Sequence, residues 1–132
     1  MSYKSQFSLD EFELYNTARR FRIAVYRLIR QLPVEEKYCL GTQMRRAALS
    51  VTNNIAEGHG RWNFRENIRF CRTARGSAGE LIDDFNACVD EGYGDPSAVE
   101  SLHCDADQLI ARINSYIAYL ERTRQGDPPE PS

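Results

Sequence analysis

The sequence predicts an all-α protein, an antiparallel up-down bundle of four helices. Apolar residues recur at alternating gaps of three and four along four long segments, so each segment keeps one stripe facing its neighbours. Proline and glycine separate these segments by short connections, and such helices pack best side by side in antiparallel order. The 132 residues, of which 42% are hydrophobic, suit one domain with a substantial core.

The first helix is predicted at residues 9–31, after a flexible N-terminus at residues 1–8. Its apolar seam consists of Leu14, Ala18, Phe21, Val25, Leu28 and Leu32. Pro33 then blocks continuation of this helix and can open the next one at its first position.

Three further helices are predicted at residues 34–58, 64–91 and 96–124, so the bundle spans residues 9–124. Asn63 is a suitable N-cap for the third helix. The three seams are Leu40, Met44, Ala47, Val51; then Phe64, Ile68, Cys71, Arg75, Ala78, Ile82, Phe85, Val89; then Val99, Leu102, Ala106, Leu109, Ile113, Tyr116, Leu120. The Pro-rich tail at residues 125–132 is predicted to be disordered.

Composition and cysteine usage favour a cytoplasmic protein without membrane contact. The formal net charge of −2 gives no global attraction to nucleic acid or to an anionic membrane. No window is apolar enough to span a membrane, and the N-terminus lacks the features of a secretion signal. The cysteines contain no CxxC pair, so we expect reduced thiols that act as small core residues. They are Cys39, Cys71, Cys88 and Cys104.

The chain shows no pattern typical of an active site, so we expect no enzymatic activity, cofactor or metal. A di-metal bundle site needs two Glu-x-x-His motifs. Glu100 and His103 form one such motif, but Ala56 stands at the matching offset before the other histidine, His59. The sequence contains no phosphate-binding loop, zinc spacing or Ser/His/Asp order.

A polar stripe runs beside the seam of the second helix, where Arg46, Ser50, Asn54 and Glu57 recur at gaps of four, four and three. A solvated face is one interpretation. A satisfied hydrogen-bond network at a helix or subunit interface is the other, and we favour it because Ser and Asn are poor helix formers.

Arg75 lies on the seam of the third helix, where a charged side chain needs a partner. An antiparallel turn near Gly60 would place Arg75 level with Arg46, too far from Glu57 for pairing. Two interpretations remain open: the guanidinium reaches water at the edge of the seam, or it forms a buried ion pair near a helix or subunit contact.

Charge is segregated along the third helix. Between residues 61 and 75 there are five arginines and one glutamate, and between residues 80 and 91 there are five acids and no base. One face carries Arg61, Arg65, Arg69 and Arg72, with Trp62 at the same end. This stripe could bind phosphates, with the indole stacking on a base. A solvated face, or pairing with acids of another subunit, is the alternative.

The outer face of the first helix carries arginines without acids, interleaved with aromatic and aliphatic residues. A bundle with one core needs no such residues outside, so they predict a protein or nucleic-acid interface, of which we favour protein. The interface residues are Phe12, Tyr15, Arg19, Arg22, Ile23 and Tyr26.

Two runs of sequence, RRAALSVTNNIAEGHGR and FRENIRFCRTARGSAGEL, resemble the 23S rRNA intervening-sequence proteins. The resemblance implies a four-helix protomer that assembles into a ring-like homopentamer and has no established enzymatic activity. A related accessory protein of diversity-generating retroelements binds nucleic acid and a reverse transcriptase. The matching motif positions are Arg45, Arg46, Ser50, Asn54, Glu57, Gly58, Arg75, Gly76, Ser77 and Glu80.

The resulting hypothesis is a non-catalytic homo-oligomer that serves as an accessory or scaffold for RNA, DNA or an enzyme that acts on them. The alternative is a protein-interaction module without nucleic-acid contact, in which the arginines pair with acids across subunits. A metal-dependent enzyme is the least favoured hypothesis.

Overall fold

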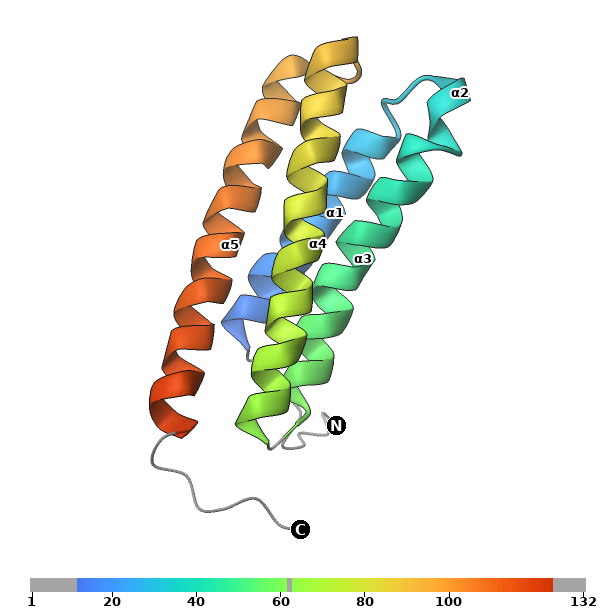
Figure 1. Cartoon of the computed structure of the whole chain (residues 1–132). Helices are drawn as coiled ribbons and strands as arrows, with labels where there is room; N and C mark the ends of the chain where they lie inside the picture. The colour runs from blue at the N-terminus through green and yellow to red at the C-terminus, as the bar shows by residue number, and fades with distance from the viewer. Residues whose placement is uncertain (1–11, 62, 125–132) are drawn as a thin grey trace, which may run out of the picture.

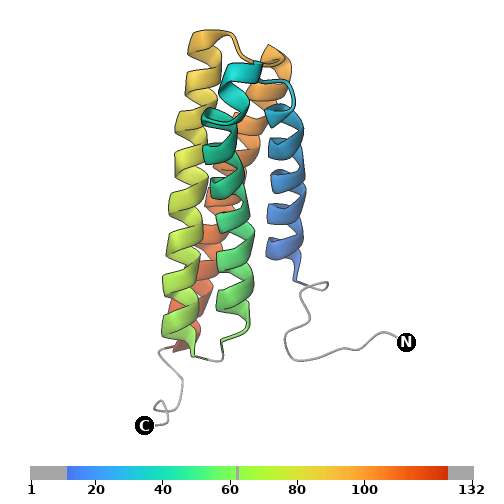
Figure 2. The same cartoon turned by 90° about the vertical axis from the view of Figure 1, so that its right-hand side faces the viewer.

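The structure, a computed structural model, describes residues 12–61 and 63–124. Its helices are α1 (Glu13–Ile29), α2 (Val34–Lys37), α3 (Leu40–His59), α4 (Phe64–Glu91) and α5 (Pro96–Arg124). The four long helices run antiparallel, and α1 packs on α3 and α5 while α4 packs on the same two helices from the other side (Figures 1 and 2). The predicted all-α bundle is confirmed, and the described residues contain no strand. The predicted N-terminal and C-terminal tails lie outside these residues.

The predicted seams form most of the core. Leu109, Ile113 and Leu120 are buried, as are the aliphatic seam residues of α1. Phe21 of α1 meets Phe85 of α4 edge to face across the bundle, at 6.3 Å between ring centroids. Val89 was predicted on the seam and is instead 65% exposed, because the last turn of α4 borders a surface pocket beside α5.

The prediction of one continuous helix at residues 34–58 is wrong, because a turn at Tyr38 and Cys39 separates α2 from α3. The short helix α2 buries none of its residues, so it lies outside the core. At Gly41 the chain approaches α1 closely, and an added Cβ would lie 3.2 Å from Ile29 Cγ2. The break therefore lets α3 start directly against the core.

Two well-defined connections set the ends of α4. Asn63 is the N-cap, as predicted, and its Oδ1 accepts hydrogen bonds from the backbone N–H groups of Arg65 (2.9 Å) and Glu66 (3.3 Å). At the other end Gly92 ends the helix with φ +71°, and Gly94 follows with φ +74°, a conformation that favours glycine. The end with α2 and the α4–α5 turn is called the apical end, and the end with the α3–α4 connection the basal end (Figure 1).

The substitution Asn63→Ala should lower the free energy of unfolding by about 1 kcal/mol, because two backbone donors of the first turn lose their acceptor. Asn86→Ala is the matched control, since Asn86 is an exposed residue inside the same helix and alanine is the better helix former. Urea denaturation followed by circular dichroism measures both variants. Equal stability of the two variants would contradict a capping role for Asn63.

Candidate functional site

The polar stripe of α3 meets α4 in a hydrogen-bonded cluster. The hydroxyl oxygens of Ser50 and Ser77 lie 2.8 Å apart, which joins the two helices. The Nδ2 group of Asn54 donates to the backbone oxygen of Ser50 at 2.8 Å and to its hydroxyl at 3.0 Å. The Asn54 amide and the Ser50 hydroxyl are thus hydrogen-bonded to each other at the α3–α4 contact inside the protomer.

Nearer the apical end of the α3–α4 contact, the two helices enclose the carboxylate of Asp84. Asp84 is 2% exposed, and its Oδ1 accepts a hydrogen bond of 2.6 Å from Gln43 Nε2. Its Oδ2 is buried without a hydrogen-bond partner among the described residues. Burial raises the pKa of Asp84 to about 6; the Gln43 hydrogen bond opposes this shift, and the charges of Asp83 and Glu80 add to it.

Asp84 was not among the predicted site residues, although the sequence carries a signal for its burial. Ala74, Ser77, Leu81, Asp84 and Cys88 form a second row at gaps of three and four on α4, and all five are buried. This row faces α3, beside the main seam. A polar residue in the middle of such a row predicts a buried hydrogen-bonded group.

The structure does not bring the predicted motif residues into one network. Arg45 lies over the ring of Tyr26 on α1, 4.4 Å from its centroid. The partly exposed Arg75 donates to Asn114 Oδ1 of α5 at 2.7 Å at the edge of the seam, and it forms no buried ion pair within the described residues. Arg46 and Glu80 make no hydrogen bond or ion pair within residues 12–61 and 63–124. Glu57 forms an ion pair with Arg61 at the basal end.

The prediction that Arg75 lies opposite Arg46 along the α3–α4 contact is also wrong. Ser50 lies opposite Ser77 and Gln43 opposite Asp84, which shifts the pairing by more than one helical turn. The reason is the length of the α3–α4 connection, because α4 begins only after Asn63.

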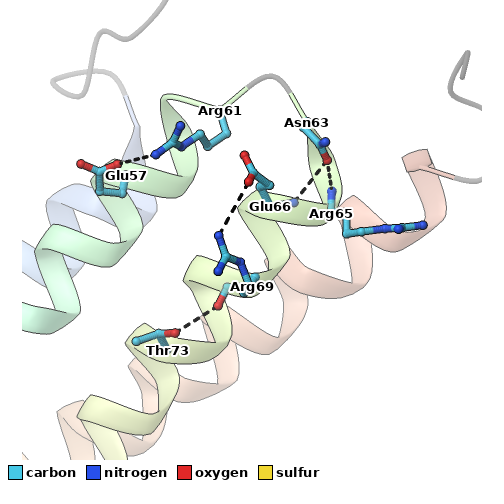
Figure 3. A network of polar contacts seen from close by, with 7 residues as sticks. All are labelled: Glu57, Arg61, Asn63, Arg65, Glu66, Arg69 and Thr73. Atoms are coloured by element: carbon cyan, nitrogen blue, oxygen red, sulfur yellow. Dashed lines mark hydrogen bonds and ion pairs between the residues drawn. The ribbon is translucent and has the colours of Figure 1, made fainter. Parts of the chain in front are cut away.

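The basal arginine stripe consists of Arg61, Arg65, Arg69 and Arg72. Three of these four arginines form ion pairs, and Figure 3 shows those of Arg61 and Arg69. Ion pairs join Arg61 to Glu57 at 3.2 Å, Arg69 to Glu66 at 3.7 Å, and Arg72 to Glu121 at 3.2 Å. The guanidinium groups of Arg61 and Arg69 also lie 5.4 Å and 5.2 Å from the centroid of the Phe70 ring. These pairs are exposed, so each contributes little to the free energy of folding. Trp62 lies outside the described residues.

The predicted interface on α1 continues onto α3. We define the α1–α3 face by Arg19, Arg22, Ile23, Tyr26, Arg45 and Leu49. Arg22 bridges the two helices through a hydrogen bond of 2.8 Å to Thr52 Oγ1, and Ile23 and Leu49 are 40% and 42% exposed. This face carries arginines and aliphatic side chains together.

The aromatic residues predicted on this outer face are only partly exposed. Tyr15 and Tyr26 pack against the core, and so does Phe12. The Phe12 ring stacks on His59 at 4.3 Å and meets Tyr116 at 5.2 Å between centroids, so it closes the basal end of the core. Burial lowers the pKa of His59. Ile23 is therefore the exposed apolar residue of the predicted set.

Opposite the α1–α3 face, α4 and α5 present an acidic surface. Residues 76–111 contain nine Asp and Glu residues and no Lys or Arg, and all of these acids except the buried Asp84 are exposed. A pocket of about 410 Å³ opens there between the end of α4 and the start of α5. Its walls include Val89, Tyr93, Val99, Glu100 and Cys104. We call this surface with its pocket the acidic α4–α5 face.

Glu100 and His103, the Glu-x-x-His motif, line the same pocket. His103 Nδ1 lies 3.5 Å from Asp107 Oδ2, one helical turn along α5. The part of the chain that the structure describes contains no group of three His, Cys, Asp or Glu side chains that could hold a metal ion.

The family model described as "23S rRNA-intervening sequence protein" matches residues 10–115. The chain belongs to this family. A crystal structure of a protein of unknown function from the S23 ribosomal protein family, from Bacteroides thetaiotaomicron, has a similar fold, with a TM-score of 0.73 and 18% identity. The similarity covers 79% of this chain and 97% of that one, and no curated protein matches.

The cysteines of this intervening-sequence protein fall into two classes. Cys71 and Cys88 are buried, and burial raises the pKa of each thiol to about 11. Cys39 and Cys104 are exposed, so the prediction that all four fill the core is wrong for these two. Cys39 directly precedes α3, Cys104 lines the pocket between α4 and α5, and neither belongs to a seam.

Among the described residues, no helix combines the length and the hydropathy that a membrane span requires.

Proposed function

We propose that this intervening-sequence protein is a non-catalytic, cytoplasmic homo-oligomer that serves as a scaffold for nucleic acid or for an enzyme that acts on nucleic acid. The placement of the arginines supports this proposal. They gather in the basal arginine stripe and on the α1–α3 face, while the acids concentrate in residues 76–111. Arginine favours both phosphate groups and protein interfaces.

Self-association is supported by the α1–α3 face, which exposes Ile23 and Leu49 among arginines. Apolar side chains surrounded by arginine are typical of the buried centre of interfaces. Multi-angle light scattering on the purified protein should give a mass that is a multiple of the monomer, and the family resemblance implies five copies. A monomer at all concentrations would contradict the homo-oligomer.

Nucleic-acid binding should depend on the basal arginine stripe. We expect Arg65→Glu with Arg69→Glu to weaken binding of a fluorescein-labelled single-stranded RNA about tenfold or more, because two phosphate contacts become repulsive. The salt dependence of the binding constant should also become shallower. Arg27→Glu with Arg30→Glu is the matched control, since it makes the same change in net charge near the apical end of α1.

Fluorescence anisotropy between low and moderate salt measures these variants. If both double variants weaken RNA binding equally, the net charge of the protein determines binding and the basal arginine stripe has no specific role. If the unmodified protein shows no binding at low salt, the nucleic-acid half of the proposal is wrong.

The second candidate, a protein-interaction module without nucleic-acid contact, is favoured by a specific observation. Three of the four arginines in the basal stripe already hold carboxylates, and two of them flank Phe70. If the protein is such a module, Arg-to-Glu changes in the basal arginine stripe should reduce the assembled fraction measured by light scattering. Neither the unmodified protein nor these variants should bind RNA.

A further inference from the structure

The pocket of the acidic α4–α5 face opens at the apical end of the bundle, beside the turn that joins the two helices (Figure 1). Its volume of about 410 Å³ lies within the range of roughly 300–1,000 Å³ that is usual for small-molecule sites. Val89 at its edge is 65% exposed, so the described chain leaves this apolar surface uncovered. We call it the apical recess and define it by Val89, Tyr93, Pro96, Val99 and Glu100.

The backbone that forms one wall of the apical recess is held by hydrogen bonds at several points. The Tyr93 N–H donates to the Cys88 carbonyl oxygen at 2.8 Å, which closes the end of α4. The Asp95 N–H donates to Gln31 Oε1 at 2.8 Å, and Asp95 Oδ2 accepts from the Ala98 N–H at 3.1 Å at the start of α5. The turn is therefore fixed on both sides, so binding of a ligand requires little reorganisation of this wall.

The charge at the apical recess is negative. Glu100 contributes an exposed carboxylate to the lining, and this carboxylate forms no ion pair within residues 12–61 and 63–124. Burial, and then the charges of Glu36 and Glu91, raise the pKa of the Tyr93 phenol, so further carboxylates act on the same wall. Among the described residues, the lining contains no lysine or arginine that could neutralise them. An apolar recess with an unneutralised carboxylate favours a cation that carries an apolar body.

We infer that the apical recess binds a small organic cation, in which a primary ammonium group is attached to an aromatic or aliphatic body. The apolar body packs against Val89 and Tyr93, and the ammonium group meets the Glu100 carboxylate at the rim. The aromatic ring of Tyr93 adds to the attraction, because the faces of aromatic rings attract cations. The recess is separate from the basal arginine stripe and from the α1–α3 face, so this binding does not depend on the proposed function.

Four small compounds test this inference in NMR titrations of the isotope-labelled full chain. Phenethylammonium carries both a ring and a positive charge, phenethyl alcohol lacks the charge, hydrocinnamate reverses it, and ethylammonium lacks the ring. The backbone amides of Gly92 and Gly94 report on the recess, and those of Gly76 and Gly79, further along α4, are internal controls. Phenethylammonium should shift the two recess resonances at millimolar concentration, severalfold more tightly than the other compounds, and leave the controls in place.

Substitutions at the rim separate the charge of the recess from the charge of the whole protein. Glu100→Gln should weaken phenethylammonium binding by about threefold to fivefold, because the ammonium group loses an exposed carboxylate partner. Asp105→Asn is the matched control, since it makes the same change in net charge on the side of α5 that faces α1, and it should leave binding unchanged. Val89→Lys should abolish binding by placing a cation at the edge. All three side chains are exposed, and circular dichroism checks the fold of each variant.

Three results would overturn the inference. If phenethylammonium leaves the Gly92 and Gly94 resonances unshifted, the recess does not bind this class of ligand. If phenethyl alcohol and hydrocinnamate bind as tightly as phenethylammonium, the recess is an apolar surface without preference for a cation. If Glu100→Gln and Asp105→Asn weaken binding equally, the cation is attracted by the net charge of the protein and the rim carboxylate has no specific role.

Discussion

Replacing Asp84 with asparagine should raise the free energy of unfolding by about 1–2 kcal/mol at pH 7.5. Asp84 is 2% exposed, and its Oδ2 has no hydrogen-bond partner among the described residues. Its folded-state pKa of about 6 exceeds the ordinary value of 3.8, so at neutral pH the fold carries the cost of a buried charge. This cost is at most about 3 kcal/mol, and the asparagine amide, which also lacks a partner there, offsets part of the gain.

Because the pKa of Asp84 is raised in the folded protein, the free energy of unfolding should fall as the pH rises from 4 to above 6. Between pH 4 and pH 6 the folded protein binds the Asp84 proton more tightly than the unfolded chain does, so this group stabilises the fold at pH 4 and loses that effect as pH rises through about 6. Urea denaturation at pH 4.5, 6 and 7.5 should show this fall in the unmodified protein. It should be absent in Asp84→Asn and present in Asp83→Asn, the exposed neighbour. A fall of equal size in both variants would contradict the assignment.

Gly58→Ala should lower the free energy of unfolding by about 2 kcal/mol, although alanine is the better helix former. An added Cβ at Gly58 would lie 2.5 Å from Asn67 Oδ1, 3.1 Å from Phe70 Cβ and 3.2 Å from the Asn67 backbone oxygen. Asn67 cannot move freely, because its Nδ2 donates to Tyr116 Oη at 3.0 Å. The end of α3 would therefore be pushed away from α4.

Gly76→Ala is the control for this substitution, because an added Cβ there meets nothing within 4 Å. It should stabilise the protein by up to about 1 kcal/mol through helix propensity alone. Thermal and urea unfolding measure both variants. Stabilisation of both would show that the basal contact between α3 and α4 is loose.

Much of the fold could be predicted because burial in a bundle follows helical periodicity. Phe21, Ile113 and Leu120 were expected in the core and are buried there. The pattern fails at the ends, where a helix has no neighbour on one side. Val89 continues the seam in sequence but borders an open pocket, and the chain turns at Tyr38 although no glycine or proline marks that position.

The polar sites were less predictable, because their partners depend on how two helices align. Ser50 and Asn54 stood out as poor helix formers beside an apolar seam, and both are hydrogen-bonded at the contact with α4. Their partner Ser77 could not be identified without the length of the α3–α4 connection. Asp84 was missed because one seam was assigned to a helix that packs on two neighbours. Whether Phe12, Tyr15 and Tyr26 contact another subunit stays a prediction.

The contact between α1 and α5 joins the first and last helices that the structure describes. The hydrogen bond of 2.6 Å from Arg112 to Thr17 Oγ1 joins residues 95 positions apart, whereas α3 and α4 are consecutive along the chain. Closing so long a loop carries a larger entropic cost than closing the hairpin of α3 and α4, and α1 packs less extensively on α5 than α4 does. We therefore expect detachment of α1 to be the lowest-energy partial opening of the bundle, with amide hydrogens of α1 exchanging with solvent before those of α4.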